Sequence, residues 1–244
     1  MPVTHEIFDH VLFALLLIIP LIEWRWNWPR YLARLAAGVP NVRLHHFRNL
    51  IIGEWIPVLC LLGYWHFRSR PFAALHLAGG TPWRFYTGLG FVAGLIGVLY
   101  LQRRAILARP ERIERVRAAL AYAEPLLPHS PAERRVFWVV SLTAGVCEEM
   151  LYRGFLFWYL AVWTGPIAAA LLSALLFGAG HVYLGPWQIP KTGFIGLLFV
   201  FVMLASGSIW PAMLLHAAID WNSGELGYAV LTAKGLAAPS NPDS

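Results

Sequence analysis

The chain has 244 residues, of which 58% are hydrophobic and only 13% are charged. An ordinary soluble domain carries about 25% charged residues, so this composition excludes that class and indicates an integral membrane protein. The formal net charge is +6, but the arginines are spread over several loops that flank apolar stretches. Topology and anionic lipid headgroups explain that distribution, so we expect a lipid bilayer and no nucleic acid as a partner.

The apolar stretches predict an all-α fold, namely a polytopic transmembrane helical bundle with about seven spans and interfacial amphipathic helices. A helix needs roughly 17–20 apolar residues to cross the hydrocarbon core of a bilayer. Six stretches are near or above that length: Ile7–Ile22, Ile51–Phe67, Phe85–Leu101, Val136–Trp163, Pro166–Tyr183 and Ile209–Leu231. A seventh, Gly193–Gly207, is shorter.

Arginines in the loops predict the orientation. Five lie in Trp24–Leu50 and eight in Gln102–Arg135, against Arg68, Arg70 and Arg84 in the loop between them. Cytoplasmic loops are enriched in Lys and Arg, so the first and third loops are expected in the cytoplasm. This places the N-terminus outside and the C-terminus in the cytoplasm, and we expect a bacterial or archaeal inner or cell membrane.

Two loop segments have the pattern of interfacial helices. Arg30–Ala37 alternates basic and apolar residues at helical spacing, and Pro110–Ala121 begins with a proline suited to a first helical turn. The third loop also divides the chain. We predict an N-terminal three-helix membrane portion (1–101), a basic cytoplasmic loop (102–135), a catalytic membrane core (136–232) and a disordered tail (233–244).

Three charges interrupt the apolar stretch that begins at Val136: Glu148, Glu149 and Arg153. Each such side chain costs roughly 2.5–3.5 kcal/mol at the centre of a membrane helix, so all three are expected to face the protein interior or a water-filled cavity. Residues four apart share a helix face, which pairs Arg153 with Glu149 and directs Glu148 roughly 140° away from Arg153 at about 100° per residue. Glu148 therefore suits a general base or acid, and Glu149 suits a structural pair.

The next apolar helices each carry one polar pattern at the same spacing. Phe177 and His181 are one turn apart, with Gly178 and Gly180 between them, and His216 and Asp220 are one turn apart near the C-terminus. Each pattern alone is weak. The three in this order, Glu-Glu-x-x-x-Arg, Phe-x-x-x-His and His-x-x-x-Asp, resemble the CPBP (ABI) family of intramembrane proteases, which includes the type II CAAX prenyl endopeptidases. The resemblance covers roughly Val136–Glu225.

The resemblance implies roles for these residues. The catalytic residues would be Glu148, His181, His216 and Asp220. Glu148 with His181 would activate water, and His216 with Asp220 would stabilise the tetrahedral oxyanion. Glu149, Arg153 and Phe177 would position the site. An ionised Asp220 cannot donate a hydrogen bond to an oxyanion, so it is either protonated or acts by orienting His216.

Glu148, His181 and His216 could also supply three ligands to zinc. The His-Glu-x-x-His motif is absent, and we favour a site that requires no metal or other cofactor. The primary hypothesis is an intramembrane endopeptidase that cleaves a membrane-anchored substrate, which carries a prenyl group, a leader or a sorting signal. One alternative is a non-catalytic membrane protein for bacteriocin immunity or peptide-export binding. Another is a proton-coupled transporter.

Overall fold

The computed structural model describes residues 5–233. These residues contain helices and no strands. In chain order the elements are α1 (Ile7–Ile22), η1 (Glu23–Asn27), α2 (Trp28–Ala36), α3 (Val42–Phe67), η2 (Phe72–Leu75), α4 (Pro82–Leu107), α5 (Pro110–Ala119), η3 (Glu124–Leu126), α6 (Pro131–Glu149), η4 (Met150–Leu156), α7 (Phe157–Gly180), η5 (Val182–Leu184), α8 (Gln188–Ser206) and α9 (Trp210–Thr232).

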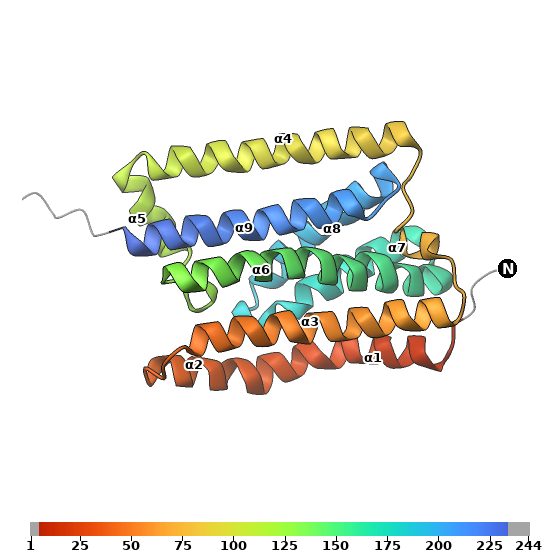
Figure 1. The fold of residues 1–244 in the computed structure, drawn as a ribbon, viewed down its shortest axis with the longest axis horizontal. Helices are drawn as coiled ribbons and strands as arrows, with labels where there is room; N and C mark the ends of the chain where they lie inside the picture. The colour runs from red at the N-terminus through yellow and green to blue at the C-terminus, as the bar shows by residue number, and fades with distance from the viewer. Residues whose placement is uncertain (1–4, 234–244) are drawn as a thin grey trace, which may run out of the picture.

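The long helices run alongside one another, which confirms the predicted helical membrane bundle (Figure 1). Within residues 5–233, the segments long and apolar enough to cross a membrane are Ile7–Ala36, Val42–Phe67, Pro82–Leu107, Pro131–Gly180 and Gln188–Ser206. The predicted count of about seven includes α9 and treats the two parts of Pro131–Gly180 separately. Those parts meet at Gly165, whose φ of 76° interrupts the helix before Pro166.

Both amphipathic segments are helical. The first corresponds to α2, which continues directly from α1 through the π-helical turn η1 and is not a separate element. The second corresponds to α5, between α4 and α6. Helix α6 starts five residues before the expected Val136, because Ser130 and Glu133 form a capping box around Pro131 at its N-terminus. The predicted disordered tail lies outside the described residues except for Ala233.

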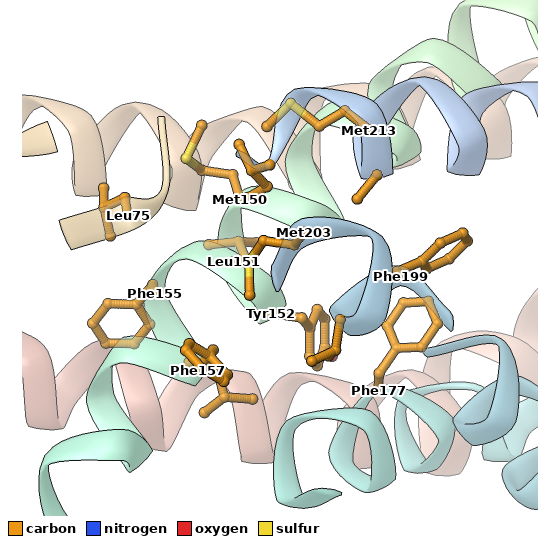
Figure 2. Close-up of a cluster of buried hydrophobic side chains, with 14 of the residues drawn as sticks. Leu75, Met150, Leu151, Tyr152, Phe155, Phe157, Phe177, Phe199, Met203 and Met213 are labelled. Carbon is orange, nitrogen blue, oxygen red and sulfur yellow. The ribbon is translucent and has the colours of Figure 1, made fainter. Parts of the chain in front are cut away.

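The core of the bundle is centred on α6 and its continuation. Helix α6 packs between α9 and α3, and α7 packs along α8 (Figure 1). Every residue of the π-helical turn η4 is buried. Figure 2 shows that this turn contributes Met150, Leu151 and Tyr152 to an apolar cluster with Phe177, Phe199 and Met203. The Glu-Glu motif therefore ends a helix in the middle of the core.

Candidate active site

An ion pair lies at the junction between α6 and η4. Nη1 of Arg153 lies 2.9 Å from Oε1 of Glu149, and both side chains are fully buried. This is the pair expected from the i, i+4 spacing. A buried charge requires a partner, and each of these residues supplies one to the other. A π-helical turn follows Glu149, and such turns are frequent at functional sites.

His216 joins α9 to this pair. Its Nδ1 lies 2.8 Å from Oε1 of Glu149, the same oxygen that Arg153 contacts. A carboxylate only accepts hydrogen bonds, so Nδ1 carries the proton and Nε2 is left to face the site. Nε2 lies 3.8 Å from Oε2 of Glu148 and 3.6 Å from Oδ2 of Asp220. The His216 imidazole therefore lies between the fully buried carboxylate of Glu149 and the more accessible carboxylates of Glu148 and Asp220.

Aromatic rings fix the position of these groups. The Phe199 ring on α8 stacks on His216, with centroids 4.7 Å apart and planes 16° from parallel. The Arg153 guanidinium lies 4.0 Å from the centroid of Phe177 and 5.1 Å from that of Phe199. In Figure 2, Tyr152, Phe177 and Phe199 lie next to one another. Cation–π contacts of this kind stabilise a guanidinium away from water.

His181 lies at the C-terminal end of α7. Its Nδ1 lies 2.9 Å from the backbone carbonyl oxygen of Phe177. A carbonyl oxygen can only accept a hydrogen bond, so Nδ1 carries the proton and, in the neutral ring, Nε2 carries the lone pair. The Phe177 and His181 rings pack edge to face with centroids 5.0 Å apart. His181 interacts electrostatically with Glu148, but among residues 5–233 no carboxylate forms an ion pair with it. The structure thus brings His181 near Glu148 without direct contact.

Glycines allow the helices to approach closely enough for these contacts. A Cβ on Gly145 would lie 2.7 Å from the Cβ of Ala217 and 2.8 Å from the carbonyl oxygen of Met213. Helix α9 therefore touches the backbone of α6 one turn before Glu149. A Cβ on Gly178 would lie 2.3 Å from the carbonyl oxygen of Ile189, so α7 and α8 are equally close. Small residues at helix interfaces are typical of membrane bundles.

A cavity of about 610 Å³ opens beside Glu148. Its walls come from the α1–α2 segment, from α3 and from the start of η4. The Glu148 side chain is 20% exposed, whereas its Oε2 atom is itself buried and has no hydrogen-bond partner among the described residues. Nearly all buried polar atoms in proteins have a partner, so an unpartnered carboxylate oxygen beside a cavity marks this position as a candidate for function.

Sequence reasoning missed two residues of this site. Phe199 gives no signal, because an aromatic residue in an apolar helix is indistinguishable from core. Glu54 on α3 lines the same cavity as Glu148 and interacts electrostatically with Glu148, His216 and Asp220. Glu54 could have been singled out from the sequence, because a lone carboxylate inside an apolar helix usually faces a cavity or a partner.

The proposed zinc ligands do not form a metal site. Within residues 5–233, no group of three or more His, Cys, Asp or Glu side chains is arranged to hold a metal ion. His216 contacts Glu149 through Nδ1, and its Nε2 lies 3.8 Å from Oε2 of Glu148. Independence from metal stays a prediction.

Glu148, His216 and Asp220 thus meet in one place, with Glu149, Arg153 and Phe177 behind them. Residues 131–222 match the family of the Type II CAAX prenyl endopeptidase Rce1-like proteins. The predicted family is thereby confirmed for the segment from the start of α6 into α9, which contains every candidate site residue named from the sequence. No curated protein and no solved structure matches the chain. The Rce1-like match supports a protease within an integral membrane protein.

Proposed function

We propose that this protein is an intramembrane endopeptidase that hydrolyses a peptide bond of a membrane-anchored protein. The observation that carries the proposal is the cluster of Glu148, His216 and Asp220, with His216 Nε2 3.8 and 3.6 Å from the two carboxyl groups. This cluster lies beside a cavity, inside a segment that matches a protease family. Peptide hydrolysis needs a base for water, an oxyanion donor and an acid for the leaving amine, and these groups can supply all three.

In the proposed reaction, Glu148 accepts a proton from a water molecule. The water oxygen then forms a bond with the scissile carbonyl carbon, and the carbonyl oxygen becomes an oxyanion. His181 orients this water through Nε2, since its Nδ1 is held by the Phe177 carbonyl. When the carbon–nitrogen bond breaks, Glu148 returns the proton to the departing amine, so the base becomes the acid.

His216 stabilises the oxyanion when Nε2 carries a proton. Its contact with Glu149 leaves Nε2 as the only ring nitrogen directed at the reacting groups. Asp220 lies 3.6 Å from that atom and orients it. Removing one oxyanion donor from a protease slows catalysis by about 10²–10³-fold, so His216→Ala is expected to have an effect of that size.

Glu149, Arg153 and Phe177 act through other residues in this proposal. Arg153 holds Glu149, and Glu149 holds His216. The Phe177 ring covers the Arg153 guanidinium, and the Phe177 backbone carbonyl accepts a hydrogen bond from Nδ1 of His181. These are positioning roles, and no cofactor or metal is required.

The proposed substrate is anchored in the cytoplasmic leaflet, with the arginine-rich ends of α2 and α5 in the cytoplasm and the N-terminus outside. The substrate classes considered are a prenylated tail, a leader peptide and a sorting signal. The family match favours the prenylated tail, because the matched family is described as prenyl endopeptidases.

The experiment compares protein termini by mass spectrometry in membranes of the native host, using wild type and a Glu148→Gln strain at matched protein levels. We expect a small set of new C-termini that are present in wild type and absent in the variant. Identical termini in the two strains across growth conditions would contradict proteolysis. That outcome would favour the immunity or export-binding alternative.

A further inference from the structure

A groove of about 240 Å³ lies between α6 and α9, and every residue that lines it belongs to one of these two helices. The helices run antiparallel, because Arg134 near the start of α6 pairs with Glu225 near the end of α9 (Figure 1). The cavity beside Glu148 is a different one, since its walls come from the α1–α2 segment, α3 and the start of η4. The groove is therefore separate from the candidate active site.

Small side chains form the floor of the groove and large ones form its rims. The floor consists of Ser141, Ala217 and Ala218, and the Ser141 hydroxyl already donates to a backbone carbonyl of its own helix. On the rims, Leu142 and Leu214 are exposed. The first and last lining positions on α9 are seven residues apart, which is about 10 Å along the helix, or a third of a hydrocarbon core of about 30 Å. The groove is thus narrow, apolar and parallel to the helices, as an acyl chain requires.

Two tryptophans, Trp138 and Trp221, line the end of the groove nearer to α5. Tryptophan is enriched where a membrane protein meets the headgroups of the bilayer, so this end is expected at the interface. Nε1 of Trp138 donates to Oε1 of Glu225 at 2.8 Å, and Arg134 contacts both oxygens of the same carboxylate at 2.7 and 2.8 Å. The negative charge of Glu225 is therefore already compensated.

Arg103, near the end of α4, brings a further positive charge to this end of the groove. Its guanidinium carbon lies 4.8 Å from the centroid of the Trp221 ring and 5.8 Å from that of Tyr100. Glu225 interacts with Arg103 electrostatically, but Arg134 holds both of its oxygens. Nη1 of Arg103 is buried and has no hydrogen-bond partner among the described residues. A buried guanidinium nitrogen without an acceptor is rare, and the phosphate of a ligand would satisfy it.

We propose that this groove binds an anionic phospholipid, with one acyl chain between α6 and α9 and the phosphate accepting a hydrogen bond from Nη1 of Arg103. The lipid belongs to the leaflet on the side of α5. Charge favours a lipid over a second copy of this chain, because a copy inserted in the same direction would bring a second arginine-rich end to the same level. The site goes beyond the proposed function, since it requires neither Glu148 nor a substrate.

The test is native mass spectrometry of the purified full-length protein with equal amounts of phosphatidylglycerol and phosphatidylcholine that carry the same acyl chains. Wild type should retain one phosphatidylglycerol in preference to phosphatidylcholine. Arg103→Gln should lower that preference about 5- to 10-fold, as expected for loss of one arginine at the headgroups. Phosphatidylglycerol should also raise the Tm of wild type but not of Arg103→Gln, because a ligand of the folded state stabilises it. An unchanged preference in Arg103→Gln would overturn the inference.

Two matched controls separate this site from general attraction to lipid. Arg104→Gln removes the same charge from the next residue of α4, an exposed arginine that does not line the groove, and should keep the wild-type preference. Ala218→Leu fills the floor and should lower retention of both lipids at least about fivefold by removing the space for a chain. Ala93→Leu adds the same volume to an exposed position of α4 and should retain lipid as wild type does. Equal losses in each variant and its control would contradict a defined site.

Further measurements distinguish the lipid from other occupants. Inorganic phosphate in large excess should neither displace the lipid nor raise the Tm, because it cannot fill the groove. A rise in Tm with phosphate alone that Arg103→Gln abolishes would assign Arg103 to a free anion and contradict the inference. A wild-type dimer that Ala218→Leu dissociates would assign the groove to a second copy and also contradict it. Glu148→Gln should retain phosphatidylglycerol as wild type does, so this inference and the proposed function can fail separately.

Discussion

Nδ1 of His216 lies 2.8 Å from Oε1 of Glu149, the oxygen that also contacts Arg153 at 2.9 Å. The second glutamate of the motif thus connects α9 to the end of α6 and fixes which ring nitrogen faces the cavity. The two adjacent glutamates have different environments, because Glu149 is fully buried and Glu148 is 20% exposed.

Replacement of each glutamate should therefore have a different effect. Glu149→Gln leaves the buried Arg153 without its counter-ion, which costs about 3–5 kcal/mol for a buried pair. We expect a large fall in Tm, measured by thermal unfolding in detergent. Glu148→Gln keeps the shape of the side chain and should retain the wild-type Tm while losing activity. A Glu149→Gln protein with wild-type Tm and activity would refute the positioning role.

Phe199 should control the orientation of the His216 ring. Phe199→Leu removes a stacking contact at 4.7 Å while keeping most of the apolar volume. A small misplacement of a catalytic group lowers rates by up to about 10²-fold, so kcat should fall by roughly 10- to 100-fold with KM little changed.

The matched control is Phe201→Leu on the same helix. Phe201 is 59% exposed and its ring contacts Phe91, not His216. Its kcat should equal that of wild type. Equal kcat values for the two variants would show that stacking on His216 does not matter for the reaction.

Gly145 should be required for the contact between α6 and α9. The Cβ of Gly145→Ala would lie 2.7 Å from the backbone nitrogen of Ala217, so α9 must move, and overpacking of this kind costs about 1–3 kcal/mol. We expect lower Tm and lower activity together. Gly94→Ala, with nothing within 4 Å of the new Cβ, should keep full activity and gain about 0.5–1 kcal/mol from helix propensity. A harmless Gly145→Ala would show that the helices separate at little cost.

Removal of divalent metals should leave activity unchanged. The side chains described do not form a three-ligand centre, and the proposed base is a carboxylate. Activity is compared before and after dialysis against EDTA and 1,10-phenanthroline. Loss of activity that added zinc restores would contradict the metal-independent mechanism.

The sequence predicted the helical bundle and the Glu149–Arg153 contact because the relevant signals are local. Apolar length predicts a membrane helix, and a four-residue spacing predicts the contact between Glu149 and Arg153. The expectation that Glu148, His216 and Asp220 lie together followed from the resemblance to a family and not from helix periodicity.

The remaining features depend on contacts between distant segments. The Glu149–His216 hydrogen bond joins residues 67 positions apart, and the stacking of Phe199 on His216 depends on how α8 packs. The cavity is formed by α1, α2 and α3 against η4, and the first three spans carry no motif of the family. Glu54 could have been identified as an intramembrane carboxylate, but its nearness to Glu148 required the packing of α3 on α6.

The central claim is that Glu148 activates water for peptide hydrolysis. The most direct measurement is cleavage of a substrate peptide by the purified protein in H₂¹⁸O, with mass spectrometry of the new C-terminus. We predict one ¹⁸O atom in the new carboxylate with wild type and no cleavage product with Glu148→Gln at equal Tm. Product formed by Glu148→Gln at the wild-type rate, or wild-type product without ¹⁸O, would contradict the account.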